Sequence, residues 1–382
     1  MKIALNSLSA QAGGGISAFI NLMPALARVD RKNEFIVFIS KDQEEILEII
    51  PDGFRKVFIN YLPKNPYVRT AWEQFALPFY LLFYRADILY SVGNITTLLA
   101  PCKIVLLIEN ANPFSNLKIK WTLKESFRIK LLWYLGRFSA KRANKIRFLS
   151  ENSKKLLVKQ LNLPEDKCVT IYHGCDDLSQ KLEDRDKKFK PEQSYILSVA
   201  VVFPHKNLEN LIRAYDILVR NYHYRGNLVI VGDLFYRDYV EKLNALISEL
   251  KLCDKVVLKG KVLHKNIGLY YANADVFVLP SIEETFGIPV VEAMRHGVPL
   301  AVSDGTLPSL KDCFIPFREI CGDAASYFDP FDPADIARKV HALISDAEYR
   351  KRILRAGEEQ VSKYKWDQTA EALTGVFEEI HH

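Results

Sequence analysis

Apolar residues in the first half of the chain occur in short runs that alternate with longer amphipathic segments. The runs are rich in Val, Ile, Leu and Phe and have the length of buried β-strands; they cover 2–6, 34–39, 55–59, 88–91, 104–108, 146–150 and 168–171. Between them, apolar positions recur at helical spacing over 18–28, 41–50, 69–84 and 153–161. Strands and helices that alternate in this way form βαβ units, which predict a parallel, doubly wound sheet.

The same alternation is repeated in the second half. Strand-like runs occur at 195–202, 228–231, 256–258, 276–279, 300–303 and 326–328. A chain of 382 residues exceeds the size at which one hydrophobic core keeps growing. We therefore predict an α/β protein of two doubly wound, Rossmann-like domains, residues 1–178 and 193–365, joined by the charged and apolar-poor segment 179–193.

One stretch, residues 280–297, combines the end of a strand, a bend and the start of a helix. Gly287 allows an unusual backbone angle, Pro289 suits the first turn of a helix, and Gly297 can cap its end. The free N–H groups at the start of a helix stabilise an anion. The stretch therefore predicts a phosphate site in front of residues 285–287.

Two carboxylates flank the predicted anion site. Glu284 lies on the bend and Glu292 lies within the helix. A carboxylate on the helix can accept hydrogen bonds from two neighbouring hydroxyls, as a ribose requires, while one on the bend reaches another part of the ligand. For an arbitrary pair of glutamates at this spacing, two solvated side chains at a helix terminus would be the simpler interpretation.

The context changes that interpretation, because the stretch closely resembles the signature of the retaining, nucleotide-sugar-dependent glycosyltransferases of family four. The family pattern runs from a strand through Pro-Ser and E-x-F-G-x-P-x-x-E-A-M to Gly-x-Pro, and this chain follows it over 280–299. The resemblance implies that Glu284 contacts the donor sugar and that Glu292 binds the ribose. It also implies the GT-B arrangement, in which two domains face each other across a cleft and a last helix, here 366–382, packs back on the first domain.

Two further segments match the family by their order and location. Gly13-Gly14-Gly15 follows the first strand, as does the family's glycine loop beneath the donor diphosphate; by itself the triplet also fits a tight turn or a dinucleotide-cofactor loop. Lys206 matches the lysine of the family's P-x-K-N segment, where it can neutralise a pyrophosphate. Glu284 and Lys206 are thus the catalytic candidates. The donor-binding candidates are Gly14, Gly15, Lys206, Val262, Glu284, Thr285, Phe286, Gly287, Ile288 and Glu292.

The chain departs from the family pattern at two places. Ala200-Val201 stands where relatives usually have Gly-Arg, so one of two expected phosphate cations is missing. Glu109-Asn110 stands where many members have His-Asp, so the sugar contact made by that His is either taken over by Glu109 or absent. Glu109, Asn110 and His173 are the candidates for the acceptor side or for sugar specificity. His173 precedes a glycine and also fits a structural role.

Residues 118–147 carry ten Lys or Arg side chains against the single acid Glu125, with aromatic residues interleaved. Such an element either rests on an anionic membrane surface or packs on the sheet with a solvated basic side. Nucleic-acid binding fits the charge, but no recognised nucleic-acid motif accompanies it, and we predict none.

The composition of the chain bears on its class, on its need for a metal or cofactor, and on its location in the cell. The chain has 49% hydrophobic and 26% charged residues and a formal net charge of +6. This composition is typical of an ordered globular protein. The six cysteines form no C-x-x-C pair, and the D-x-D sequence at 184–186 lies in the predicted linker, so we expect no metal and no cofactor. The N-terminus lacks a signal-peptide layout and no apolar run has transmembrane length. We expect a cytoplasmic protein, at the inner membrane face if residues 118–147 dock there.

The predicted function is a retaining glycosyltransferase that moves a hexose, such as mannose or glucose, from a nucleotide-diphosphate sugar to a saccharide or lipid-linked acceptor in cell-surface polysaccharide synthesis. Three alternatives stay open. The first is another reaction on the same fold, such as a sugar-nucleotide epimerase or a phosphorylase. The second is a non-catalytic, sugar-nucleotide-binding partner subunit, which the two departures from the pattern would explain. The third is an NAD-dependent oxidoreductase.

Overall fold

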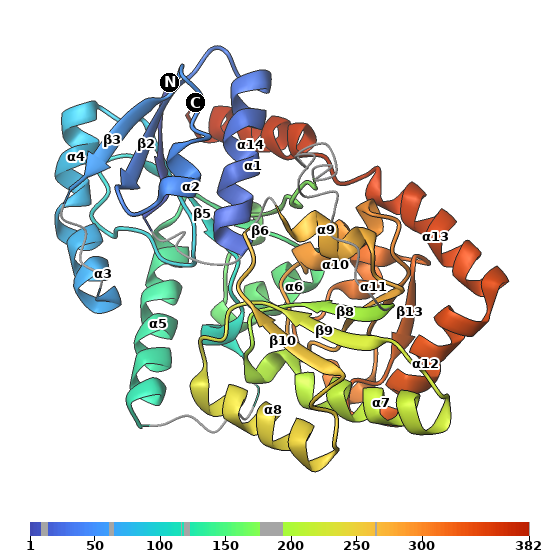
Figure 1. Cartoon of the computed structure of the whole chain (residues 1–382). Helices are drawn as coiled ribbons and strands as arrows, with labels where there is room; N and C mark the ends of the chain where they lie inside the picture. Colours follow the sequence, from blue (N-terminus) through green and yellow to red (C-terminus); the bar gives the residue numbers. More distant parts are fainter. Residues whose placement is uncertain are drawn as a thin grey trace. The chain divides into compact units, whose positions relative to one another are not determined.

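The structure is a computed structural model, which describes residues 1–8, 14–60, 65–115, 117, 123–175, 194–263 and 266–381. The chain divides into two compact units (Figure 1). The first consists of Met1–Gly174 and Lys365–His382, and the second of Cys175–Tyr364. The predicted linker at 179–193 lies outside the described residues.

The first unit is built on a seven-stranded sheet with the order β3-β2-β1-β4-β5-β6-β7, in which every paired neighbour is parallel. Its strands are β1 (Lys2–Asn6), β2 (Glu34–Ser40), β3 (Arg55–Ile59), β4 (Ile88–Ser91), β5 (Lys103–Ile108), β6 (Lys145–Phe148) and β7 (Cys168–Thr170). Most of their side chains are buried on both faces, as the near-continuous apolar runs predict.

Helices cover both faces of this sheet. They are α1 (Gly14–Val29), α2 (Glu44–Leu47), α3 (Pro66–Phe75), α4 (Leu77–Tyr84), α5 (Leu123–Arg142), α6 (Glu151–Leu161) and α14 (Trp366–His381), with short 3₁₀ turns η1 (Asn112–Phe114) and η2 (Glu165–Lys167). Helix α14, from the end of the chain, lies along α1 (Figure 1). An ion pair between Arg28 and Asp367 and a hydrogen bond from Thr369 to the carbonyl of Tyr172 hold it there.

The second unit has a six-stranded parallel sheet with the order β10-β9-β8-β11-β12-β13. Its strands are β8 (Tyr195–Val199), β9 (Asn227–Val231), β10 (Val256–Gly260), β11 (Val276–Leu279), β12 (Leu300–Ser303) and β13 (Ala325–Phe328). The helices are α7 (Leu208–Asn221), α8 (Arg237–Glu249), α9 (Ile267–Ala272), α10 (Ile288–Arg295), α11 (Phe317–Cys321), α12 (Pro333–Ser345) and α13 (Ala347–Val361), with 3₁₀ turns η5 (Pro204–Lys206) and η7 (Pro308–Leu310).

Both sheets have the doubly wound strand order, so the prediction of two Rossmann-like α/β domains is confirmed. The order reverses between β1 and β4 in the first unit and between β8 and β11 in the second. In open α/β sheets, ligands bind beyond the carboxyl ends of the strands at such a reversal. This rule directs the search for a site to the loops after β1, β4, β8 and β11.

Candidate functional site

The loops after β8 and β11 meet at the carboxyl edge of the second sheet. The backbone N–H of Ile282 donates to the carbonyl of His205 over 2.9 Å, and the amide of Asn207 donates to the carbonyl of Pro280 over 3.2 Å. These bonds join the η5 turn to the bend before α10. Two segments that are far apart in the sequence thereby form one edge of the candidate site.

The two predicted catalytic residues are brought together at this edge. Lys206 Nζ forms an ion pair with Glu284 Oε1, and both side chains are only 14% exposed. Ser281 Oγ also donates to Glu284 Oε1, over 3.2 Å. An ammonium has three N–H donors, so Lys206 can bridge this carboxylate and an anionic ligand at the same time.

The start of α10 has the geometry that the sequence predicts. Gly287 caps the helix with φ of 86°, and a Cβ at this position would come within 2.8 Å of the Phe317 ring, so only glycine fits without strain. Ile288 is the first helical residue. The side chain of Phe286 is buried against Tyr364, so this residue can contact a ligand only through its backbone. The backbones of its neighbours Thr285 and Gly287 can contact the ligand as well.

Residues 304–320 follow β12 and contain the 3₁₀ turn η7 and the start of α11. The structure shows a packed support for the bend: Phe314, Ile315 and Phe317 are buried, and the Glu284 N–H donates to the carbonyl of Phe314. Asp304 and Arg318 form an ion pair at its base. The apolar residues of this segment therefore belong to the core beneath α10.

Glu292 lies on α10, buried beside Tyr271 of α9. The Tyr271 hydroxyl donates to Glu292 Oε2 over 2.7 Å, and the His296 ring stacks on Tyr271 with 5.2 Å between ring centroids. Burial raises the pKa of Glu292 to about 7, and the Tyr271 hydrogen bond opposes part of that rise. Since a carboxylate has about four lone-pair positions, it can still accept hydrogen bonds from two ligand hydroxyls.

The remaining second-unit candidates lie on loops at the same edge of the sheet. Val262 is half-buried just beyond the end of β10. At the end of β9, Gly232 lies so close to Ala200 that a Cβ would come within 1.8 Å of the Ala200 carbonyl oxygen. The pair Ala200-Val201 therefore follows β8 in a tightly packed turn, in which both side chains are apolar.

In the first unit, Gly14 and Gly15 form the first residues of α1, and Gly13 lies outside the described residues. The helix therefore begins earlier than the predicted residue 18. Asn6, at the end of β1, donates to Glu73 Oε2 of α3 over 3.2 Å. Burial raises the pKa of Glu73, and the Asn6 hydrogen bond lowers it again. A buried carboxylate thus lies at the end of β1.

Glu109 and Asn110 follow β5, where Asn94 orders their backbone. Asn94 Oδ1 accepts hydrogen bonds from the N–H groups of Glu109 and Asn110, over 3.0 and 3.1 Å, and Asn94 Nδ2 donates to the Asn110 carbonyl. Burial raises the pKa of Glu109 to about 7, and the positive charge of Arg147 partly opposes this rise. Asn110 itself is exposed.

Arg147 of β6 is fully buried beneath these residues. It donates to the Tyr90 hydroxyl over 2.8 Å and to the carbonyls of Ile171 and Tyr172, and its Nη2 lies 3.4 Å from His173 Nδ1. Because a guanidinium only donates, Nδ1 of His173 is the acceptor. Burial, followed by the Arg147 charge, lowers the pKa of His173 well below its usual value. His173 is therefore a neutral, structurally held side chain that also packs against the ring of Trp366 at a tilted angle.

This burial removes Arg147 from the basic surface that the sequence predicts for residues 118–147. Arg147 is part of the sheet interior and cannot face a membrane, because β6 carries it into the core. Lys145 pairs with Glu379 of α14. The basic helix α5 ends at Arg142, and residues 118–122 lie outside the described part of the chain. Within the described ranges, no helix is both long and apolar enough to cross a membrane.

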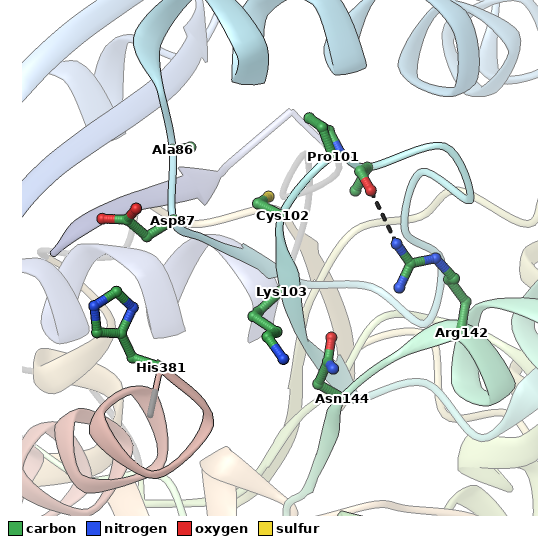
Figure 2. Close-up of a pocket in the computed structure, with 9 residues that line it drawn as sticks. Ala86, Asp87, Pro101, Cys102, Lys103, Arg142, Asn144 and His381 are labelled. Carbon is green, nitrogen blue, oxygen red and sulfur yellow. Dashed lines mark hydrogen bonds between the residues drawn. The ribbon is translucent and has the colours of Figure 1, made fainter.

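A pocket of about 570 Å³ lies elsewhere on the first unit (Figure 2). Its lining includes Asp87, Lys103, Arg142 and His381, and Arg142 donates to the carbonyl of Ala100 over 2.9 Å. Asp87 and Lys103 lie at the amino ends of β4 and β5. The pocket is therefore at the opposite edge of the sheet from Glu109 and is separate from the candidate site.

Sequence reasoning missed three side chains that shape these clusters. Tyr271 and Tyr90 lie in apolar runs, where a tyrosine usually indicates core packing, and Arg147 was read as one of many surface cations. A basic residue between two buried apolar residues, Ile146 and Phe148, was the available signal, since an arginine at a buried strand position needs several acceptors.

The fold and the site together define a class of protein: two parallel α/β units, with a bend and a helix start after β11 in the second. Comparison with known families agrees with this class. The model of group 1 glycosyl transferases matches residues 179–360, and that of glycosyltransferase family 4 matches residues 12–177. The chain belongs to the family-four glycosyltransferases.

Curated relatives support the same membership. An uncharacterized glycosyltransferase of Methanocaldococcus jannaschii is 31% identical over 60% of this chain and 58% of its own length. An O-antigen chain mannosyltransferase of Salmonella typhimurium is 31% identical over 52% of this chain and 50% of its own. The matched part of the chain thus spans about half the length of these relatives.

Solved structures show the same fold throughout. Sucrose-phosphate synthase of Thermosynechococcus elongatus superposes with a TM-score of 0.77 at 16% identity, covering 100% of this chain and 99% of that one. Anabaena HepE in complex with UDP-glucose gives a TM-score of 0.75 at 17% identity, covering 99% of this chain and 100% of the other. These neighbours are GT-B proteins, so the fold is of the GT-B class.

Proposed function

We propose that this protein transfers a hexose from a nucleotide-diphosphate sugar to an acceptor hydroxyl, with retention of the anomeric configuration. One observation carries the proposal. At the switch point of the second sheet, the Lys206–Glu284 ion pair, the start of α10 and the Glu292–Tyr271 pair lie on two joined loops and two short helices, α9 and α10. This arrangement suits a ligand with an anionic centre and hydroxyl groups on both sides of it.

The chemistry follows from the charges. When the bond between the sugar C1 and the diphosphate oxygen breaks, negative charge builds up on the departing diphosphate. The acceptor oxygen forms the new bond to C1, and the proton of the acceptor hydroxyl passes to the departing diphosphate. Preorganised donors aimed at that charge lower the barrier. Lys206 and the N–H groups of residues 285–288 supply such donors, so we propose that the reaction needs neither metal nor cofactor. Unchanged turnover in a strong chelator would support this; loss of turnover that Mg²⁺ or Mn²⁺ restores would contradict it.

We assign Glu292 to the ribose, Glu284 to the sugar being transferred, and Val262 to the base through its backbone. Gly14, Gly15, Glu109 and Asn110 belong to the sugar or acceptor side. For the substrates, the names of the relatives favour mannose in a cell-surface polysaccharide, and the acceptor is a saccharide or a lipid-linked saccharide. Glucose is the alternative sugar, since HepE was solved with UDP-glucose.

A thermal-shift screen of GDP-, UDP- and dTDP-sugars is the first test, because a ligand that binds the folded state raises the melting temperature. Hits are then incubated with acceptor saccharides, and NMR of the product reports the anomeric configuration. An inverted product would exclude the retaining mechanism. If no donor in the panel binds, the donor assignment is wrong.

A second candidate is a sugar-nucleotide-binding subunit without catalytic activity. Ala200-Val201, which removes a phosphate cation, favours it. Tight donor binding by calorimetry, with neither transfer nor hydrolysis across the donor panel, would decide for this candidate. The epimerase alternative is separated by product analysis with the sugar nucleotide alone.

A further inference from the structure

Helices α3 and α4 expose a stripe of large apolar side chains. Phe75, Phe79, Leu82 and Phe83 are 68, 72, 58 and 77% exposed. Ala76, between the two helices, keeps helical backbone angles, so these positions follow the i, i+4, i+7, i+8 spacing of one helix face. The stripe is therefore continuous across the junction of the two helices.

This stripe has no role in holding α4 on the sheet. The opposite face of α4 is already buried through Leu77, Pro78 and Leu81, and Tyr80 and Tyr84 pack edge-on against Phe38 of β2. A helix that is apolar on all sides is typical of a protein interior or of contact with lipid. Contiguous apolar surface of this kind on a soluble unit marks an interaction site.

A short loop connects the stripe to the basic helix α5. The Gln74 side chain bonds the backbone of Thr96 and Leu98, while Ser139 and Arg142 of α5 bond the same loop at Thr96, Leu98 and Ala100. Leu99 lies on this loop with its side chain 62% exposed, and Phe138 of α5 is 53% exposed. We call the combined surface, made of Phe75, Phe79, Leu82, Phe83, Leu99 and Phe138, the aromatic face.

Cations surround the aromatic face. Arg85 follows α4 directly, Lys103 and Arg142 line the pocket of Figure 2, and Lys141 is exposed beside Phe138. Residues 55–145 contain 15 Lys or Arg against 4 Asp or Glu, although the net charge of the whole chain is only +6. The part of the chain that contains the aromatic face therefore has a larger excess of basic residues than the whole chain.

We propose that the aromatic face docks on an anionic lipid bilayer, with the rings of α3 and α4 in the interface and the surrounding cations on lipid phosphates. Aromatic rings are favoured at the membrane–water interface, and each Lys or Arg near an anionic surface adds about 1 kcal/mol. The insertion element is α3–α4, a segment outside residues 118–147. A second copy of the chain fits this face less well, because a two-fold contact would bring the same cations together.

Sedimentation with vesicles of phosphatidylcholine and phosphatidylglycerol in equal amounts tests the proposal. The full-length wild-type protein should sediment at low salt and progressively less as salt is added. The double variant Phe79→Gln/Phe83→Gln should bind at least about tenfold more weakly, because the apolar part of the contact is lost. Both side chains are more than two-thirds exposed, so this variant should fold.

The matched control is Phe235→Gln, an aromatic residue of the second unit that is 68% exposed. It should sediment as the wild type does, and vesicles of phosphatidylcholine alone should bind the wild type at least about tenfold more weakly than the mixed vesicles. Charge reversal of Arg85, Lys103 and Lys141 should abolish the salt-dependent part of binding. The assay uses neither donor nor acceptor, so its result is independent of the proposed activity.

Three results would overturn the proposal. Wild-type protein that stays in the supernatant at low salt would remove the membrane altogether. Equal sedimentation of the wild type and the double variant would place the contact elsewhere. A wild-type dimer in analytical ultracentrifugation that the double variant converts to monomer, without vesicle binding by either, would show that a second copy covers the face.

Discussion

The polar clusters of the two units differ in how the chain assembles them. In the second unit, the candidate residues come mainly from one continuous stretch, 280–297, to which the fold adds Lys206 and Tyr271. In the first unit, the cluster around Arg147 takes Tyr90 from β4, Glu109 from the end of β5 and His173 from beyond β7. Adjacent residues in a motif can be recognised in a sequence, while residues from separate strands are brought together only by the sheet.

The two clusters should also differ in what they do. Arg147 is fully buried and satisfies backbone carbonyls, as a structural group does, whereas Lys206 and Glu284 are partly exposed at the carboxyl edge of a sheet. We therefore expect substitutions in the first cluster to change stability and substitutions in the second to change turnover and binding. Five variants test this division.

Arg147→Leu should have the largest effect, a loss of about 3–5 kcal/mol in the free energy of unfolding of the first unit, because the Tyr90 hydroxyl and two carbonyls lose their partner in the core. Amide hydrogen exchange of β4 to β7 measures it. Arg31→Leu, at an exposed position of the same unit, is the control and should change stability by less than about 0.5 kcal/mol. An equally small change for Arg147→Leu would contradict the structural role of the cluster around Arg147.

Lys206→Ala should lower turnover about a hundredfold to a thousandfold, because it removes a cation placed for the departing diphosphate. Lys242→Ala breaks an ion pair with Glu209 in the same unit and should leave turnover unchanged. Glu284→Gln should lower turnover more than nucleotide affinity. Wild-type turnover in Lys206→Ala would rule out the proposed role of the ion pair.

Glu292→Gln should weaken the binding of nucleotide diphosphate by about 1.5–3 kcal/mol, since a charged acceptor for the ribose hydroxyls is lost. Calorimetry with the free nucleotide measures this loss, and Glu284→Gln is the comparison. Equal losses for both variants would show that the two carboxylates do not divide their roles as assigned.

Glu292→Gln should also change how the stability of the protein depends on pH. The pKa of Glu292 is raised from 4.5 to about 7 in the folded protein, so the folded state holds its proton more tightly than the unfolded chain. Its contribution to stability is present below pH 4.5 and is lost as the pH rises towards 7. The free energy of unfolding of Glu292→Gln should lack that part of the pH dependence, and an unchanged slope would contradict the raised pKa.

Tyr271→Phe should have the smallest effect, about 1 kcal/mol of nucleotide affinity near neutral pH. The Tyr271 hydrogen bond lowers the pKa of Glu292, so its removal should move the pH midpoint of nucleotide binding upward and let affinity recover at higher pH. Tyr239→Phe is the matched control, because this buried tyrosine donates to a different glutamate, Glu209. Loss of affinity at every pH, without a shift of the midpoint, would mean that Tyr271 acts only in packing.

Differences between predicted and observed elements have local causes. The helix predicted over 69–84 is two helices, because Pro78 cannot donate to the Gln74 carbonyl, which instead accepts a hydrogen bond from Thr97 Oγ1 over 3.2 Å. The helix predicted at 41–50 is reduced to Glu44–Leu47. These boundaries depend on single side chains, whereas the alternation of strands and helices depends on many residues together.

The two parallel sheets, the bend and helix of 280–297 and the two glutamates on it can be predicted from local sequence patterns, because hydrophobic periodicity, glycine and proline act over a few neighbouring residues. Four features become visible only in the folded chain: Lys206 meets Glu284 across 78 residues, Tyr271 orients Glu292, Arg147 is buried, and the rings of α3 and α4 face outward. These pairings depend on which strands become neighbours and which helix face the sheet covers. Burial and charge pairing between distant segments are properties of the folded chain, so local sequence patterns do not specify them.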